Sequence, residues 1–304
     1  MGECMVELTR TGESTMHQSF AGDVYNSAVY LKRCFSGIDT SLITVLGSDG
    51  LSQDMKAQFE QEQINTDWVF TSEDRVPGLY LVKTDDQGER SFTYWRNASA
   101  ARTVMNYFDD QTTQNLLNGD MFFFSGISLA VIEPESRERF WQRLVQLRTA
   151  GVKVVFDPNY RARLWQSEDE AKQQFEKAFS MSDILLPGID DFSALYQLNN
   201  FDQVNTFLKP FNIAEIIVKN GPESVIAVVD NVTNEHRITP VSHVVDTTSA
   251  GDSFNGTYLG ARLSGYAVKD AIELASKAAG YVIQHKGAIV DKDSFKQFMQ
   301  PHLN

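Results

Sequence analysis

The sequence predicts an α/β fold with an open parallel sheet covered by helices on both faces, and a smaller, separate β-sheet. In the middle and C-terminal parts, short apolar runs alternate with amphipathic stretches, which is the pattern of repeated βαβ units. Between residues 67 and 97, strand-like segments follow one another with no helical stretch between them. A chain of 304 residues, 42% of them hydrophobic, is long enough for a large domain with such an appendage.

The main sheet is expected from apolar runs that are each followed by a helical stretch. The run at 121–125 precedes a helix that begins at Pro134, since proline is tolerated in the first helical turn. The run at 152–156 is followed by a helix that Ser167 and Glu170 can cap. Two further strands are expected at 184–186 and 216–218, and the chain after Leu263 is predicted to be helical.

The smaller sheet is expected from segments at 68–70, 79–82 and 91–95, with turn signals such as Asp85–Gly88 between them. We predict that these strands are antiparallel. Large aromatic side chains on so small a sheet need burial, either over a substrate or against a second subunit. The natural interpretation is a lid over a binding site.

Composition and charge exclude several classes of partner. The chain has 40 acidic and 27 basic residues, a formal net charge of −13, and no basic run. A nucleic-acid surface and an anionic membrane partner are therefore not expected. Cys4 and Cys34 lack metal-site spacing and are predicted to be buried thiols in a reducing compartment. With no basic leader and no long apolar run, the protein is expected to be cytoplasmic.

The strongest chemical signal is the run 246–254, Asp-Thr-Thr-Ser-Ala-Gly-Asp-Ser-Phe. A strand ending near Val245 is expected to lead through small residues into a helix that opens around Gly251. Small residues let a ligand approach the backbone, and the first N–H groups of a helix favour an anion. A carboxylate at the same place, Asp252, can accept a proton from an attacking hydroxyl. The alternative is that Asp252 only caps the helix.

The whole run resembles the C-terminal signature of the ribokinase-like, or phosphofructokinase-B type, sugar kinases. This resemblance implies a three-layer α/β/α sandwich, with residues 1–304 as a single catalytic domain and a β-sheet lid formed by about 7–20 and 66–98. It also implies ATP and Mg²⁺ as cofactors. The absence of a Gly-x-x-x-x-Gly-Lys-Ser/Thr loop excludes the P-loop kinases.

The resemblance extends to other motifs and assigns roles to their residues. Asp252 is the implied base, Arg161 is implied to neutralise phosphate or sugar acid, and the backbone N–H groups at Ala250 and Gly251 are implied to hold the developing charge. Sugar contacts are implied for Gly22, Asp23 and Asn26, although this segment also fits a tight turn with a helix cap. Nucleotide contacts are implied for Asn159, Lys219, Gly221, Ser224, Ser249, Ala250 and Gly251.

One departure concerns the metal. The family often carries Asn-x-x-Glu near the metal, whereas this chain has Gly188 and Asp191 at the matching positions. Asp191 keeps a carboxylate and is the candidate metal ligand. The alternative is that the acidic pair at 190–191 caps a helix.

Within this family the chain resembles the 2-keto-3-deoxygluconate kinases in particular, and the matching positions are Tyr80, Tyr94, Arg96 and Arg161. In that subfamily the matching positions contact the acid sugar or the phosphates. Arginine suits this task because its planar guanidinium forms a charge-assisted fork with a carboxylate. The alternatives are an exposed cross-strand charge for Arg96 and a structural ion pair for Arg161.

The implied reaction is ATP-dependent phosphorylation of 2-keto-3-deoxygluconate at its terminal hydroxyl. A kinase for a neutral sugar such as fructose or ribose is an alternative, and so is a protein that only senses a sugar acid. Lids of this type often pair between subunits, so we expect a homodimer or a higher homo-oligomer through the lid.

Overall fold

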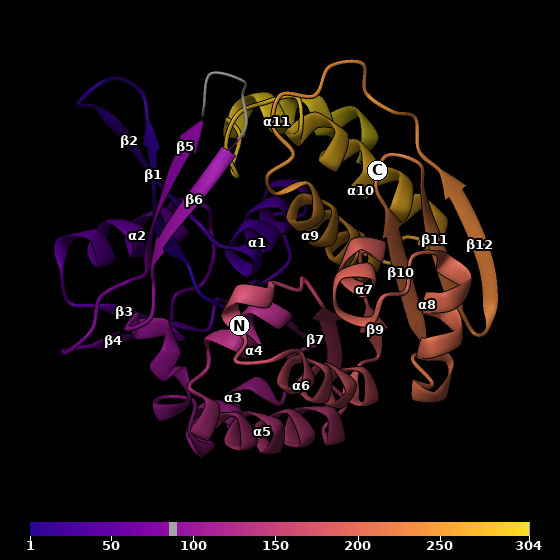
Figure 1. The fold of residues 1–304 in the computed structure, drawn as a ribbon, viewed down its shortest axis with the longest axis horizontal. Helices are drawn as coiled ribbons and strands as arrows, with labels where there is room; N and C mark the ends of the chain where they lie inside the picture. The colour runs from indigo at the N-terminus through magenta and orange to yellow at the C-terminus, as the bar shows by residue number, and fades with distance from the viewer. Residues whose placement is uncertain (85–89, 304) are drawn as a thin grey trace.

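The central feature of the computed structural model, which describes residues 1–84 and 90–303, is a six-stranded sheet (Figure 1). The strand order is β12-β11-β10-β9-β8-β7; β7 to β10 run parallel, and β11 and β12 continue the sheet antiparallel. The bounds are β7 (Met121–Ser125), β8 (Lys153–Asp157), β9 (Ile184–Leu185), β10 (Glu215–Asn220), β11 (Ser224–Val229) and β12 (Val232–Arg237).

Both faces of this central sheet are covered by helices, except at the exposed edge strand β12. Neighbouring residues of a strand point to opposite faces, and on β8 Val154 and Phe156 join one apolar cluster while Val155 joins another. The first cluster contains side chains of α3 (Asp110–Leu116), α4 (Gly126–Val131), α5 (Arg137–Thr149), α6 (Glu168–Met181), α7 (Ile189–Tyr196) and α8 (Phe201–Leu208). The second contains side chains of α1 (Asp23–Cys34), α9 (Ala250–Leu263), α10 (Val268–Val282) and α11 (Lys292–Met299).

A second sheet of four strands lies beside this sandwich (Figure 1). Its order is β2-β1-β5-β6, from β1 (Met5–Arg10), β2 (Met16–Ala21), β5 (Leu79–Thr84) and β6 (Arg90–Trp95), and we call it the small sheet. The central pair β1 and β5 is parallel, so the prediction of a purely antiparallel sheet is wrong. The predicted turn at 85–88 lies outside the described residues.

The predicted segment at 68–70 does not belong to the small sheet. It forms part of β4 (Val69–Ser72), which pairs in parallel with β3 (Thr44–Gly47) in a separate two-stranded sheet. The cause is burial, because Val69 packs into an apolar cluster with Met55 and Phe59 of α2 (Gly50–Gln61). The small sheet therefore comes from 5–10, 16–21, 79–84 and 90–95.

Several local predictions can be compared with the structure. Cys4 and Cys34 are buried, and the Ser167 hydroxyl accepts the backbone N–H of Glu170 at the start of α6. The strand expected to end near Val245 is absent from the described residues; instead the N–H groups of Val245 and Asp246 donate to the Ile283 carbonyl. Within the described part of the chain, no helix combines the length and apolarity needed to cross a bilayer.

Candidate active site

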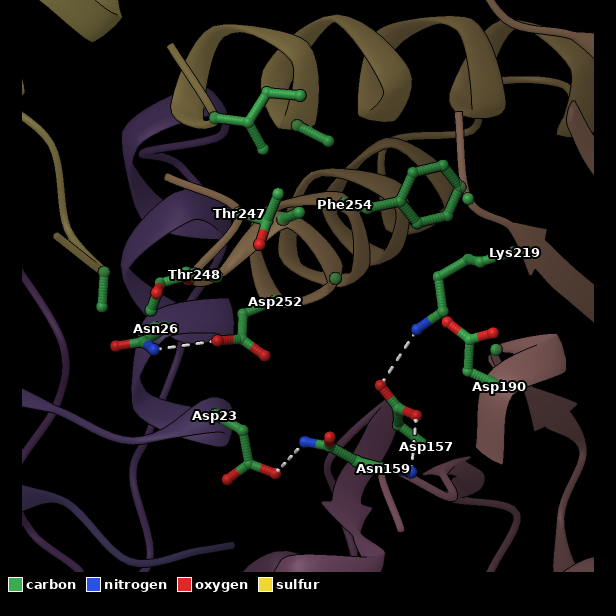
Figure 2. Close-up of a pocket in the computed structure, with 18 of the residues that line it drawn as sticks. Asp23, Asn26, Asp157, Asn159, Asp190, Lys219, Thr247, Thr248, Asp252 and Phe254 are labelled. Carbon is green, nitrogen blue, oxygen red and sulfur yellow. Dashed lines mark hydrogen bonds and ion pairs between the residues drawn. The ribbon is translucent and has the colours of Figure 1, made fainter. Parts of the chain in front are cut away.

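A cavity of 1340 Å³ lies where the small sheet, the carboxyl ends of β8 and β10, and the start of α9 meet. Open α/β sheets place ligands at the carboxyl ends of their strands. Figure 2 shows acidic and amide side chains from α1, β8 and α9 gathered around this space. The cavity contains most of the residues that the sequence assigns to sugar, nucleotide and metal.

Asp252 is the third residue of α9 and projects into the cavity (Figure 2). The preceding Ser249 has φ of 63°, in the left-handed region that costs energy for a residue other than glycine. The turn places Ser249 and the first residues of α9 in the wall of the cavity. Burial, together with the negative charge of Asp23, raises the pKa of Asp252 to about 7.

Asn26 on α1 holds the Asp252 carboxylate in place. Its Nδ2 donates to Asp252 Oδ2 at 2.8 Å (Figure 2). Its Oδ1 accepts the N–H of Gly22 at 3.3 Å. On the opposite side, Asn159 Nδ2 donates to Asp23 Oδ2 at 2.9 Å. The predicted sugar-binding turn is thereby joined to the base, across a separation of more than 200 residues in sequence.

Gly22 is required by space rather than by its backbone angles. Its φ of 179° is extended, which any residue adopts. A Cβ at this position would lie 2.1 Å from the Glu3 carbonyl oxygen and 3.1 Å from the Cys4 Cα. The glycine therefore lets the start of α1 approach the chain that enters β1.

The middle of the cavity holds a buried network around Asp157 at the end of β8. Lys219 Nζ donates to Asp157 Oδ2 at 3.0 Å (Figure 2). It also donates to Asn255 Oδ1 at 3.1 Å. Asn255 Nδ2 also donates to Asp157 Oδ2, at 2.5 Å. This network fixes the Lys219 ammonium beside the start of α9, where it can meet a phosphate.

Asp191 lies on α7 and has a clear structural role. Its Oδ1 accepts the Tyr160 N–H at 2.8 Å, and its Oδ2 accepts the Gly188 N–H at 3.0 Å, so it caps the helix. Burial raises the pKa of Asp191 to about 6, and the neighbouring Asp157 carboxylate also raises it. Among the described residues no group of three or more acidic, histidine or cysteine side chains forms a metal cage.

The small sheet contributes two aromatic side chains, and an ion pair lies just outside the ends of its strands. Tyr80 and Tyr94 stack with their ring centroids 5.5 Å apart, and the Tyr80 hydroxyl donates to the Glu7 carboxylate. Arg96 is buried and forms an ion pair with the buried carboxylate of Glu3. The alternative of an exposed cross-strand charge for Arg96 is therefore wrong.

Of the remaining residues predicted from the sequence, all but one line the cavity. Arg161, Gly221, Ser249, Ala250 and Gly251 line the cavity. The alternative of a structural ion pair for Arg161 finds no carboxylate partner among the described residues, where its guanidinium donates to the Tyr160 carbonyl at 2.9 Å.

Ser224 is the exception. Its side chain is 1% exposed and does not line the cavity, because the alternation of strand β11 turns it into the protein.

Sequence reasoning assigned no role to Glu3, Asp157, Asn255 or Arg163, although all belong to the cavity wall or to its hydrogen-bond network. One signal was available for Asn255, which follows Asp252 by three residues on the same helix and so shares its face. Asp157 ends a predicted strand, which is also a typical ligand position. Glu3 carries no local signal, because its partner lies 93 residues away.

Residues 1–294 match the family described as pfkB family carbohydrate kinase. The 2-dehydro-3-deoxygluconokinase of Dickeya dadantii is 37% identical to this chain over 299 residues, covering 95% of each protein. The solved structure of the 2-dehydro-3-deoxygluconokinase of Thermotoga maritima has a TM-score of 0.83 and 22% identity, covering 98% of both chains. The fructokinase of Xylella fastidiosa, solved with bound ATP, has a TM-score of 0.83 and 19% identity, covering 99% of this chain and 97% of its own. The predicted sandwich fold is thereby confirmed.

Proposed function

Since the chain belongs to the pfkB family of carbohydrate kinases, we propose that it transfers the γ-phosphoryl group of ATP to the terminal hydroxyl of 2-keto-3-deoxygluconate, also called 2-dehydro-3-deoxygluconate. The observation that carries the proposal is Asp252, a carboxylate with a raised pKa, at a helix start that opens into a large cavity. Relatives named for this substrate are similar along almost the whole chain.

Asp252 acts as the general base. It takes the proton of the sugar hydroxyl as the hydroxyl oxygen attacks the γ-phosphorus and the bond to the β-phosphate oxygen breaks. The N–H groups of Gly251 and Asp252 have no partner within the first helical turn and support the phosphoryl charge. The N–H of Ala250 contributes less, because it donates to the Thr247 carbonyl at 3.3 Å.

The nucleotide occupies the part of the cavity bordered by Lys219, Gly221 and Ser249, with Asn159 beside the phosphates. Mg²⁺ commonly binds through one or two carboxylates together with substrate phosphates and water. The cavity wall fits this mode, since Asp157, Asp190 and Asp191 all line it. Asp191 already accepts two backbone N–H groups and would reach the ion through water. Bound Mg²⁺ supplies charge compensation for the phosphates.

The sugar lies under the small sheet, which we propose acts as the lid, formed by residues of about 7–20 and 66–98 except β4. Gly22, Asp23 and Asn26 border it from α1, and Tyr80 and Tyr94 cover it. Exposed Trp95 on the same sheet supports a homodimer through the lid, which sedimentation of the purified chain would test.

Acid-sugar selectivity is the part of the proposal that a variant tests directly. Arg161→Met should raise the KM for the sugar acid roughly 10- to 150-fold, because a charge-assisted hydrogen bond contributes about 1.5–3 kcal/mol. Arg96→Ala is a poor variant for this purpose, since it leaves Glu3 buried without its partner, at a cost of about 3–5 kcal/mol.

A coupled assay measures the rate of ADP release in the presence of Mg-ATP and one of four substrates: 2-keto-3-deoxygluconate, fructose, ribose or gluconate. Preference for the keto-deoxy acid supports the proposal. Turnover of fructose or ribose instead would support a neutral-sugar kinase. Binding of the acid with no turnover of any sugar would support a sensor.

The raised pKa of Asp252 predicts how activity depends on pH. The base must be unprotonated, so kcat/KM for the sugar should fall roughly tenfold for each pH unit below about 7 and level off above it. The measurement is the rate at limiting sugar between about pH 5 and pH 9. Parallel determination of the KM for Mg-ATP separates ionisation of the nucleotide, and a flat sugar profile would contradict the assignment of the base.

A further inference from the structure

The cations that line the cavity differ in whether the protein already neutralises them. Lys219 is paired with Asp157, and Arg96 with Glu3. Arg161 and Arg163 also line the cavity, and neither forms an ion pair with a carboxylate among the described residues. Arg237 of β12 and Lys277 of α10 line the same cavity, but Arg161 and Arg163 lie only two residues apart beside the end of β8. Two such neighbouring guanidinium groups, in a chain with net charge −13, indicate that an anion binds between or beside them.

Arg163 is held on the sugar side of the cavity by an aromatic contact. It lies in the short 3₁₀ helix Ala162–Leu164, which follows the end of β8. Its guanidinium carbon is 3.9 Å from the centroid of the Tyr94 ring on β6. Tyr94 in turn stacks on Tyr80, at an angle of 21° between the rings. The arginine thus connects the sandwich with the inner face of the small sheet.

This contact restricts the guanidinium without neutralising it. A cation over an aromatic face gains about 0.5–2 kcal/mol and keeps its full charge. The N–H groups at the edge of the guanidinium remain able to donate, and a carboxylate matches their planar fork. A pre-positioned fork loses less side-chain entropy on binding than a mobile one.

We propose that Arg163 is a specificity-determining residue that binds the carboxylate of the sugar acid, with Tyr94 holding its guanidinium in position. The inference deepens the proposed function and rests on it. A nucleotide phosphate is the other anion that such a group could bind. The position of Arg163 against Tyr94 favours the carboxylate. Tyr94 belongs to the small sheet, under which the sugar is proposed to lie, whereas the phosphates are proposed to lie at the start of α9.

The test compares Arg163→Met, which keeps much of the side-chain volume, with Arg163→Lys, which keeps the charge. The KM for 2-keto-3-deoxygluconate should rise roughly 10- to 150-fold in Arg163→Met and less in Arg163→Lys, with the KM for Mg-ATP unchanged. Arg148→Met on α5, outside the cavity, is the matched control and should behave as the wild type. An unchanged KM for the sugar acid, or a rise in the KM for Mg-ATP instead, would overturn the proposal.

Calorimetric titration of the sugar acid without nucleotide separates this inference from the proposed reaction. Weaker binding by Arg163→Met would support the carboxylate contact even if the wild type showed no turnover, in which case only the kinase proposal fails. Equal binding by both proteins would overturn the contact. Thermal unfolding of the variants checks that loss of the Tyr94 contact leaves the fold intact.

Discussion

Replacing Asp252 with asparagine is expected to lower kcat by about 10²- to 10⁴-fold, the range typical of a lost general base. Asparagine keeps the size of the side chain and can still contact Asn26, but it cannot accept the proton of the sugar hydroxyl. The sugar should still bind, because the variant leaves the cavity wall in place. Single-turnover phosphate transfer and calorimetric binding of the sugar measure the two effects separately.

Stability provides a further check on the Asp252 variant. In the folded protein the pKa of Asp252 is about 7, above the ordinary value of 3.8 for an aspartate side chain, so ionisation of Asp252 destabilises the fold. The contribution of protonated Asp252 to the free energy of unfolding is complete below about pH 4 and is lost as the pH rises through about 7. At pH 8 the asparagine variant should therefore unfold at a temperature no lower than the wild type.

A matched control is available on the neighbouring helix. Asp270 is the third residue of α10, as Asp252 is of α9, but it is exposed and lies outside the cavity. Asp270→Asn should leave kcat unchanged. If Asp252→Asn turned over sugar as fast as Asp270→Asn, Asp252 would be only a helix cap and the base would lie elsewhere.

Replacing Gly256 with alanine is expected to damage both stability and catalysis. Gly256 lies where α9 crosses α1, and a Cβ there would lie 2.0 Å from the Ser27 carbonyl oxygen and 3.0 Å from the Leu31 nitrogen. Both contacts are backbone atoms, so the helices must move apart. Overpacking of this kind costs about 1–3 kcal/mol, occasionally more.

The same movement reaches the active site, because α1 carries Asn26 and α9 carries Asp252. A shift of about 1 Å between them can lower kcat about 100-fold. Urea denaturation gives the change in the free energy of unfolding, and the coupled assay gives kcat. Gly50→Ala is the control, since a Cβ at Gly50 in the first turn of α2 meets nothing within 4 Å. Wild-type stability and kcat in Gly256→Ala would contradict the close helix contact.

Short segments of the sequence determined where several strands lie, where α9 begins and which residue is the candidate base. The run 246–254 predicted the start of α9 and the carboxylate at its third residue, because small residues and helix ends act over a few neighbouring positions. The apolar runs at 121–125 and 152–156 predicted β7 and β8, since burial on both faces requires such runs. Strand identity and the candidate base are therefore readable from short segments.

The tertiary structure alone decided the partners of those segments. Residues near 69 form a strand as expected, but burial against α2 pairs them with β3 instead of with the small sheet. Arg96 directly follows the predicted strand at 91–95, and its partner Glu3 lies far away in sequence. Arg163 contacts Tyr94, which belongs to the small sheet. A short segment encodes whether it can pair, whereas the choice of partner depends on which side chains compete for the same buried space.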